Sequence, residues 1–579
     1  MTNGITVNNN IFEGNIAWLS SGIVVQGSSR VIMDSNVFRD GSVHTADALL
    51  SEAWTLSPVF HLLQYTFDPI GVYSADGFTG RYSQSPLWIK MSDQVSITNC
   101  LFDRNKASAY GNYWQGSAIT LQRLIGMNSP VISGCTFQNY AGLWNLSSLA
   151  YSEFDDGSDY ETIVQRNSKY LDVYYTQNTA PLITVNFWDG IFEFTYTNDT
   201  SFSDYNEPFR GNTSLIVDSC IFQNNIFNQT GWNYEGYWET YKLYANHSFI
   251  VKGFSLNETI EYSGWFEYLN ELLSTNFYPF YNTQGSPFSQ KLLIIRNSQF
   301  LNNSVYSPQP LFSNTIFDVL SVENCYFEKN LIAFKDDSSV MRANTAFFVA
   351  RDDTMYRHYR PYQQILLKDL QFSNNSGPIF FSNYTLNAST DSQDSNSLFQ
   401  LQNLKIAKHK SQLPLFYFDS TFNVQISGLY LSEITAKTSA FFFTNIGEIQ
   451  TGSVIIDGIN NVDDTLPFSS DSPDNYKSIG ATSLCVTLAQ THDFTLEDFS
   501  CLRPNFQESI VYGTNTIGVC ASLSRVTTTA VNNFTCSESS CHDSSCSHLA
   551  LLTSQNTQSE LVIQGSQFTS NTAFQAIMI

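Results

Sequence analysis

Charged residues are scarce in this sequence, and basic residues are the scarcer kind. Only 14% of the 579 residues are charged, and Lys+Arg 28 against Asp+Glu 52 leaves a formal net charge of -24. A surface of this sign repels phosphate backbones and anionic lipid head groups. We therefore expect no nucleic-acid partner and no binding to a membrane surface.

Long apolar runs are also missing, because no stretch of about 18 apolar residues occurs that could form a transmembrane helix. The hydrophobic content is nevertheless 42%, enough for an extensive core, so the chain is expected to fold. Asn, Ser, Thr, Tyr and Phe replace the missing charges, and these residues favour strands and turns over helices. The composition predicts an all-β protein.

A short repeat that ends on phenylalanine recurs along the chain. The residues seven and five positions before the Phe are nearly always aliphatic, which predicts a strand with alternate side chains pointing inward. A small or polar residue two positions before the Phe marks a corner. Three positions after it Asn recurs, where we expect a tight turn that uses the tolerance of Asn for left-handed dihedral angles. The clearest copies end at Phe12, Phe38, Phe102, Phe137, Phe222, Phe300, Phe327, Phe372 and Phe568.

A further apolar run, such as SAITLQ or AFFFTN, follows each second corner after a loop of variable length. A unit of three short strands cannot bury itself alone, but stacked units pair their strands in parallel around a shared apolar interior. Weaker copies before Phe568 bring the total to about 14 coils. We predict an all-β, right-handed parallel β-helix solenoid over residues 1–579, since parallel crossovers are almost always right-handed.

Apolar strands that end in FxxN, as in FDRN, FQNN, FLNN, FEKN, FSNN and FTSN, give the chain a family resemblance. It resembles the pectin-lyase-like right-handed β-helix proteins, especially the passenger regions of chlamydial polymorphic outer membrane proteins. Its Asn, Tyr and Phe bias is similar to that of large β-helical surface proteins of ciliates. The resemblance implies the same β-helical fold and a place at the cell surface.

Insertions are predicted at about 42–90, 141–185, 226–290, 331–362 and 462–480. The longest is rich in aromatic residues, and exposed Trp and Tyr make platforms for partners or for sugars. Alternatively, these side chains form a small core of their own beneath the loop. The residues are Trp232, Tyr234, Tyr237, Trp238, Tyr241 and Trp265.

Enzymatic activity is not expected, although pectin-lyase-like folds often cleave acidic polysaccharides. Such enzymes need carboxylates at a fixed separation, or a calcium site with a basic residue. Here the paired acids lie between coils, and Arg351, Arg357, His358 and Arg360 form a basic cluster that we interpret as a solvated loop. The paired acids are Asp155-Asp156, Asp336-Asp337, Asp352-Asp353 and Asp463-Asp464. We therefore predict no catalytic residue, and a carbohydrate-active lyase or hydrolase is the alternative.

Metal and cofactor sites are not expected either. The acidic tract Glu153, Asp155, Asp156, Asp159 and Glu161 lacks the defined spacing of a calcium loop. Cys541, His542, Cys546 and His548 lie too close together for the usual zinc finger. A local disulfide between Cys541 and Cys546 is the preferred interpretation of that cluster.

Cysteines concentrate in the C-terminal coils, 485–579. Stacked coils bring equivalent Cα atoms within reach of a disulfide, so bridges Cys485–Cys520 and Cys501–Cys536 are predicted, with ladders of thiols as the alternative. Cys100, Cys135 and Cys220 fall in consecutive coils, where we expect reduced thiols.

N-glycosylation sequons occur at a frequency that chance would also supply, but most of them lie in insertions or just past the Phe corner, where a glycan would point outward. They begin at Asn145, Asn198, Asn212, Asn228, Asn246, Asn257, Asn302, Asn374, Asn383, Asn387 and Asn533. With the cysteines, they favour an extracellular or cell-surface protein.

The sequence thus indicates a noncatalytic scaffold or recognition protein of the cell surface, with a role in adhesion or assembly. Its partners are expected to be proteins or glycans. Because the first and last strands have no polar caps, we expect the coils to continue in a longer chain or to meet other subunits at both ends.

Overall fold

A computed structural model shows a chain built of strands. It describes residues 4–17, 20–43, 85–90, 92–107, 118–124, 128–145, 182–187, 214–230, 251–253, 292–306, 311–313, 319–332, 346–351, 364–383, 398–411, 413–419, 423–436, 439–444, 446, 448–460, 483–489, 493–506, 517–524, 528–541, 546–552, 560–571 and 575–578. Across these ranges β-strands occur without any helix, which confirms the all-β prediction. Accordingly, the described residues hold no helix that could span a membrane.

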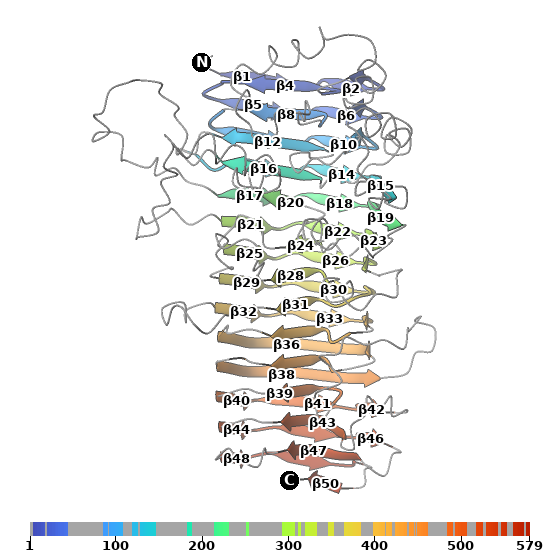
Figure 1. Cartoon of the computed structure of the whole chain (residues 1–579), viewed down its shortest axis with the longest axis vertical. Coiled ribbons are helices and arrows are strands. Elements are labelled where there is room, and N and C mark those ends of the chain that lie inside the picture. The colour runs from blue at the N-terminus through green and yellow to red at the C-terminus, as the bar shows by residue number, and fades with distance from the viewer. Residues whose placement is uncertain are drawn as a thin grey trace, which may run out of the picture. The chain divides into compact units, whose positions relative to one another are not determined.

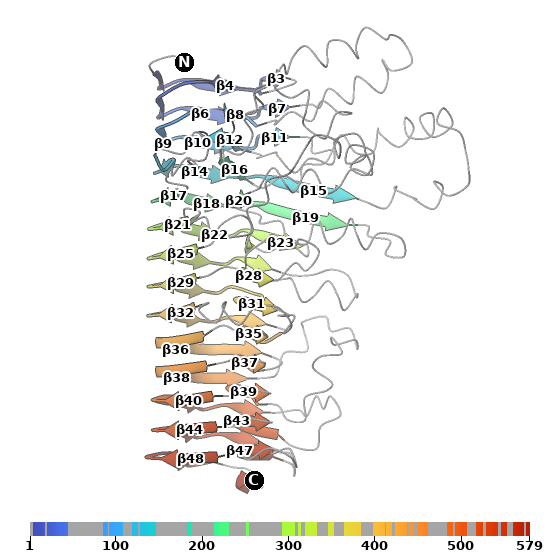
Figure 2. The ribbon, with the colours of Figure 1, turned by 60° about the vertical axis from the view of Figure 1, so that its left-hand side comes forward.

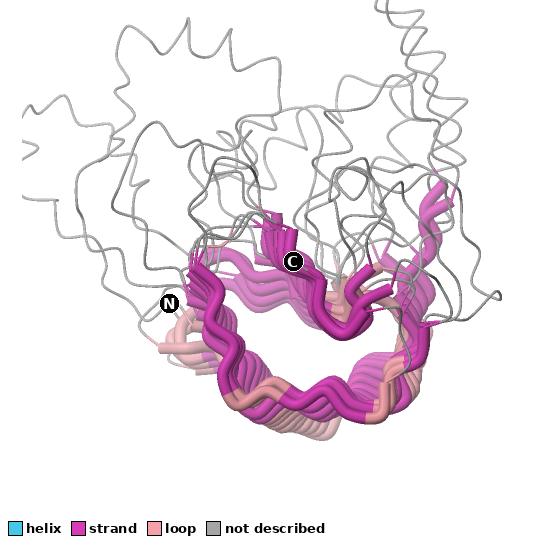
Figure 3. The backbone as a smooth tube through the Cα atoms, turned by 90° about the horizontal axis from the view of Figure 1, so that it is seen from below, coloured by secondary structure: helices cyan, strands magenta, loops and turns pink. Residues whose placement is uncertain are grey.

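The chain divides into two compact units, each a stack of short parallel strands (Figures 1 and 2). Unit 1 comprises Met1–Ile216, Asn225–Lys242 and Phe249–Lys291. Unit 2 comprises Val217–Asn224, Leu243–Ser248 and Leu292–Ile579. In both, successive strands and corners follow one another around a coil (Figure 3). This arrangement agrees with a solenoid of the β-helix kind.

Unit 1 stacks equivalent strands of successive coils in register, so that Ile5 pairs with Val31 and Val31 pairs with Val95. The first strands of the coils are β1 (Ile5–Asn8), β5 (Val31–Asp34), β9 (Val95–Thr98) and β13 (Val131–Ser133). The second strands are β2 (Ile11–Glu13), β6 (Val37–Arg39), β10 (Leu101–Asp103) and β14 (Thr136–Gln138). The third are β3 (Ile16–Ala17), β7 (Ser42–Val43), β11 (Lys106–Ala107), β15 (Ala141–Asn145) and β19 (Ile226–Thr230). A five-stranded sheet holds β4 (Ile23–Gln26), β8 (Leu87–Lys90), β12 (Ile119–Leu124), β16 (Ile183–Phe187) and β20 (Val251–Gly253).

Unit 2 repeats this order, and β17 (Leu215–Asp218) lies at its boundary. Its first strands are β21 (Leu292–Arg296), β25 (Val319–Glu323), β29 (Gln364–Lys368), β32 (Leu398–Gln402), β40 (Asp493–Glu497), β44 (Thr528–Asn532) and β48 (Glu560–Gln564). Its second strands are β18 (Ile221–Gln223), β22 (Gln299–Leu301), β26 (Tyr326–Glu328), β30 (Gln371–Ser373), β33 (Lys405–Ala407), β41 (Phe499–Leu502), β45 (Thr535–Ser537) and β49 (Gln567–Thr569). Its third strands are β23 (Ser304–Tyr306), β27 (Leu331–Ile332), β34 (Lys410–Ser411), β42 (Asn505–Phe506) and β46 (Ser540–Cys541).

Two long strands of unit 2, β36 (Asn423–Ala436) and β38 (Glu448–Asn460), each run through all three of these positions. The opposite wall is a nine-stranded sheet of parallel strands. Its members are β24 (Phe312–Ser313), β28 (Phe348–Arg351), β31 (Phe380–Asn383), β35 (Phe416–Asp419), β37 (Phe441–Thr444), β39 (Val486–Ala489), β43 (Ile517–Ser524), β47 (Cys546–Leu552) and β50 (Gln575–Met578).

The core of each unit consists of the aliphatic and phenylalanine positions of the repeat. In unit 1, Val31, Met33 and Phe38 are at most 1% exposed. The repeated rings stack face to face, with centroids 5.0 Å apart between Phe38 and Phe102. In unit 2 the centroids of Phe300 and Phe327 are 4.6 Å apart. The predicted inward phase of the first two strands is therefore confirmed.

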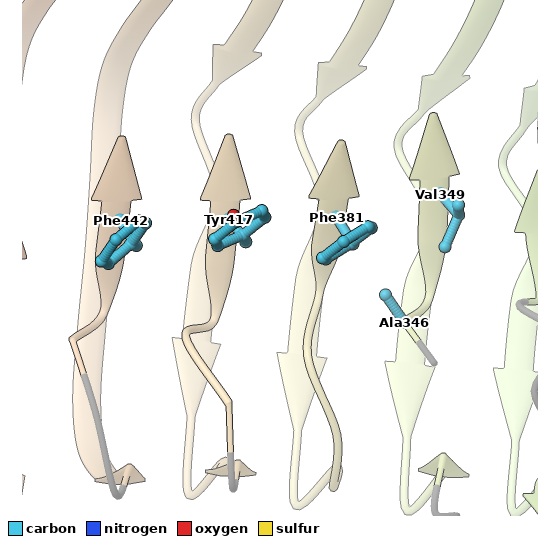
Figure 4. Close-up of a cluster of buried hydrophobic side chains, with 5 residues drawn as sticks. All are labelled: Ala346, Val349, Phe381, Tyr417 and Phe442. Carbon is cyan, nitrogen blue, oxygen red and sulfur yellow. The ribbon is translucent and has the colours of Figure 1, made fainter. Parts of the chain in front are cut away.

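The nine-stranded sheet of unit 2 buries side chains on its outer face as well. While Phe416 and Phe441 point into the coil, Phe381, Tyr417 and Phe442 point to the other side, and Figure 4 shows these three in a row with Val349. They are nevertheless only 3% to 5% exposed. This wall is therefore apolar on both faces, as is usual for covered parallel sheets.

Each repeat turns two corners through residues with left-handed backbone angles. One lies three residues before the Phe position, as at Asn324, and the other two residues after it, as at Lys329. The expectation that the recurrent Asn occupies the second turn is wrong. The left-handed residue directly precedes that Asn, and it can be Arg104 or Lys329 because one such residue costs only about 1 kcal/mol.

Two corner glycines of the long strands allow a matched test. Gly428 and Gly458 have φ of +66° and +75°, so alanine strains both, by about 1 kcal/mol. A Cβ at Gly428 would also overlap Oδ1 of Asn403, whereas at Gly458 the nearest atom lies 3.9 Å away. We expect Gly428→Ala to lower the free energy of unfolding by about 1 to 2 kcal/mol more than Gly458→Ala in urea denaturation. Equal losses would contradict the clash.

Candidate functional site

The aromatic platform predicted from the sequence lies outside the described residues. This holds for Trp232, Tyr234, Tyr237, Trp238, Tyr241 and Trp265, and equally for the acidic tract and the paired acids. Of the basic cluster only Arg351 is placed, at the end of β28. These predictions remain untested.

Metal ligands do not gather in the described part of the chain, where no group of three or more His, Cys, Asp or Glu side chains could hold an ion. Cys541 lies in β46 and Cys546 in β47, with side chains outside the described set. The predicted bridge between them stays a prediction.

The disulfides join different cysteines from those predicted. Cys485 bonds to Cys501 and Cys520 bonds to Cys536, with Cα atoms 6.3 Å and 6.2 Å apart. The predicted pairs are wrong although their register is right, because Cys501 does stack on Cys536. Neighbours in parallel strands point their Cβ atoms in the same direction, whereas cysteines on facing walls of a coil point toward each other. Each bridge therefore ties the two walls of a coil together.

Four further cysteines with described side chains are buried thiols. Cys100, Cys135 and Cys220 are reduced, as predicted, and Cys325 joins them. Burial raises the pKa of the Cys325 thiol to about 12. A thiol that stays protonated at neutral pH is a poor nucleophile, so Cys325 is a packing residue.

A row of buried asparagines is the most ordered polar feature, and the sequence pattern did not predict it. These are the Asn residues three positions after the Phe. Asn303, Asn330 and Asn375 in unit 2 are each 1% exposed, and Asn105 and Asn225 in unit 1 are equally buried. We call the series the asparagine ladder. The recurrence of Asn at this position was the signal that could have revealed the ladder. The left-handed residue directly before it varies in type from coil to coil, and a residue needed only for a turn would vary in the same way.

Each rung of the ladder bonds to the coils on both sides. The Asn330 side-chain amide donates to the Phe300 carbonyl at 2.7 Å and to Asn375 Oδ1 at 3.0 Å. Its own Oδ1 accepts from the backbone N–H and the side-chain amide of Asn303, at 3.0 Å and 2.9 Å. Buried polar groups are stable only when paired, and this pattern pairs them rung by rung.

His409 takes the rung after Asn375 and interrupts the ladder. Its ring is fully buried, with Nε2 2.6 Å from the Gly377 carbonyl and Nδ1 without a hydrogen-bond partner. The neutral ring with its proton on Nε2 fits this environment, since it donates to the carbonyl. Burial lowers the pKa of His409 to about 4, against the opposing effect of the Gly377 carbonyl.

The His409 environment predicts a dependence of stability on pH. The unfolded chain binds the proton near pH 6.5 and the folded chain only near pH 4, so acid favours unfolding across this window. We expect the stability conferred by neutral His409 to fall by about 3 kcal/mol from above pH 7 to pH 4. His409→Asn restores a rung that cannot titrate. In urea denaturation, the free energy of unfolding of the wild type should fall relative to that of the variant as the pH is lowered. A difference that stays constant with pH would contradict the assignment.

Charged side chains on the outer faces pair between successive coils. Arg104 makes two bonds to Asp40, at 2.8 Å and 2.9 Å, and Arg503 bonds to Asp457 at 2.8 Å. Hydrogen bonds from Thr98 and then Asn99 lower the pKa of Asp34. A carboxylate held ionised in this way accepts hydrogen bonds and is unsuited to donate a proton as a general acid.

Three sequon asparagines have described side chains: Asn302, Asn374 and Asn533. All three are exposed and occupy left-handed corners. Asn145, Asn228 and Asn383 are placed by backbone alone, in β15, β19 and β31. The other predicted sequons, Asn198, Asn212, Asn246, Asn257 and Asn387, lie outside the described residues.

Comparison of the chain with protein-family models, with curated proteins and with solved structures found no match.

Proposed function

We propose that the protein is a noncatalytic extracellular or cell-surface scaffold. In this proposal a right-handed parallel β-helix of about 14 coils, related to the pectin-lyase-like proteins, presents insertions to protein or glycan partners. The aromatic insertion at about 226–290 supplies the main contact, because Trp and Tyr combine large apolar area with hydrogen bonding.

One observation carries the proposal: the part of each coil from the first strand to the ladder Asn has a constant length, whereas the rest of the coil varies in length. We call the constant part the regular arc. The stretch from the first strand to the ladder Asn is continuous, as at 5–15, 95–105 and 320–330. Between the third strand and the next first strand, by contrast, the connection varies in length from residues 437–447 to residues 146–214. A regular arc with variable connections elsewhere is the layout of a scaffold that carries binding segments.

The test removes part of the aromatic insertion and leaves the regular arc of every coil intact. Residues 231–250 are replaced by a short Gly-Ser linker in the full chain, and Ile226→Ser serves as a control at an exposed strand position. We expect unchanged circular dichroism and melting temperature in both, and loss of binding to immobilised glycans or matrix proteins only in the first. Release of unsaturated or reducing sugars from polygalacturonate or alginate by wild type would overturn the noncatalytic function in favour of a carbohydrate-active enzyme.

A further inference from the structure

We propose that Asn302 and Asn374 carry N-linked glycans on one row of corners in unit 2. The inference rests on the proposed extracellular function, because these glycans are added in the secretory pathway. It goes further by selecting two positions among many sequons and by naming the surface that they occupy.

Both asparagines combine the acceptor motif with an outward position. They begin Asn302-Asn303-Ser304 and Asn374-Asn375-Ser376. Both lie at the second corner with φ near +50°, at 52° and 54°, and both are exposed. The next residue in each motif is a buried rung of the ladder. The corner therefore separates two adjacent asparagines, one facing solvent and one facing the core.

Sequons avoid the buried rungs. None of the ladder asparagines has Ser or Thr two residues later. These asparagines are the buried Asn105, Asn225, Asn303, Asn330 and Asn375 and the half-buried Asn571. Every sequon asparagine with a described side chain is at an exposed corner instead. The glycosylation sequon and the exposure of the side chain, two independent criteria, thus identify the same asparagines as glycan acceptors.

The linkage fits the contacts of both side chains. Nδ2 attacks C1 of a sugar held on a lipid diphosphate, the bond from C1 to the diphosphate oxygen breaks, its electrons leave with the lipid diphosphate, and Nδ2 loses one proton to a base. One N–H remains on the substituted amide. It can keep the bond from Asn302 to Asn224 Oδ1, at 2.9 Å, or from Asn374 to Ser373 Oγ, at 3.2 Å.

The two glycans would share one surface. Asn302 follows β22 and Asn374 follows β30, and β26 with Lys329 at its corner lies between these strands. Two strand spacings separate the sites, about 10 Å. The row would be covered by sugar, so partner contacts of the scaffold belong on other surfaces.

The experiment uses the full chain, secreted from a eukaryotic host behind a cleavable signal. The protein is digested to peptides, and an amidase in heavy-oxygen water hydrolyses each glycan from its Asn, which becomes an Asp that carries the heavy oxygen. Mass spectrometry then maps these Asp residues. We expect Asn302 and Asn374 to be modified in most copies. Ser304→Ala and Ser376→Ala should each remove one glycan and leave the asparagine and the melting temperature in place.

A shifted motif is the matched control. Ser304→Ala with Val305→Thr moves the sequon from Asn302 to the buried Asn303. We expect secretion to fall at least tenfold, or Asn303 to stay unmodified. The same variant made in bacterial cytosol, where no glycan is added, shows whether Val305→Thr alone disturbs folding.

Three outcomes would overturn the inference. A secreted chain with glycans elsewhere but none at Asn302 and Asn374 refutes it and leaves the extracellular function standing. Full modification of Asn303 with undiminished secretion refutes the separation of inward and outward asparagines. A chain that folds in bacterial cytosol but never reaches the medium contradicts the extracellular function and, with it, this inference.

Discussion

Replacing Asn330 by alanine is expected to lower the free energy of unfolding by about 3 to 6 kcal/mol, one of the two largest effects that we predict. The change removes the donor to the Phe300 carbonyl and the acceptor for Asn303, and it takes one partner from Asn375. A buried polar group left without a partner costs about 1 to 3 kcal/mol, and several are affected here. Urea denaturation followed by circular dichroism measures the loss.

The control for Asn330 is an asparagine of similar sequence context that lies outside the core. Asn302 is exposed, and within the described part of the chain its side-chain amide bonds to Asn224 alone. Asn302→Gly keeps the left-handed corner accessible and should change stability by less than about 1 kcal/mol. If Asn330→Ala lowers the free energy of unfolding no more than this control does, the hydrogen bonds of the ladder do not stabilise the fold.

Phe222→Ala is the second large effect, with an expected loss of about 3 to 5 kcal/mol. Phe222 is fully buried, and its ring stacks on Phe300 with centroids 5.0 Å apart. The cavity cannot collapse easily, because the backbone on either side is fixed by parallel pairing to the next coil. Calorimetry or urea denaturation gives the value, and Ile221→Ala, at the outward neighbour, is the matched comparison. A loss below about 1 kcal/mol would show that the Phe position does not fill the core.

Most of the fold could be predicted because its periodicity is local. Alternation from Val31 to Met33 and the Phe38 that follows them specify which side of the strand faces inward, and repetition of the motif implies parallel stacking. The prediction succeeds at these positions because a large apolar side chain is stable only in the interior of the coil.

The errors arose where one residue type suits two environments. Asn is at home both in a left-handed corner and in a buried hydrogen-bonded row, and only the structure separates Asn302 from Asn303. For the cysteines, spacing placed Cys501 beside Cys536, but it held no information on side-chain direction across the coil. His409 stands where the repeat has Asn, so its burial follows the repeat, whereas its unpartnered Nδ1 follows from no pattern in the sequence.

The direction of the asparagine ladder has a consequence for how the chain can change. A rung such as Asn330 donates one side-chain N–H to the Phe300 carbonyl of the preceding coil and the other to Asn375 Oδ1 of the following coil. Its own Oδ1 accepts from Asn303 of the preceding coil, so each such rung has the same two interfaces. A duplicated coil would insert between two existing rungs and satisfy both, whereas a single extra residue within the arc would break the row at that point. We therefore expect unequal recombination that duplicates a whole repeat in the gene to preserve the fold. Short in-frame insertions should be tolerated only in the parts of the coil that already vary in length.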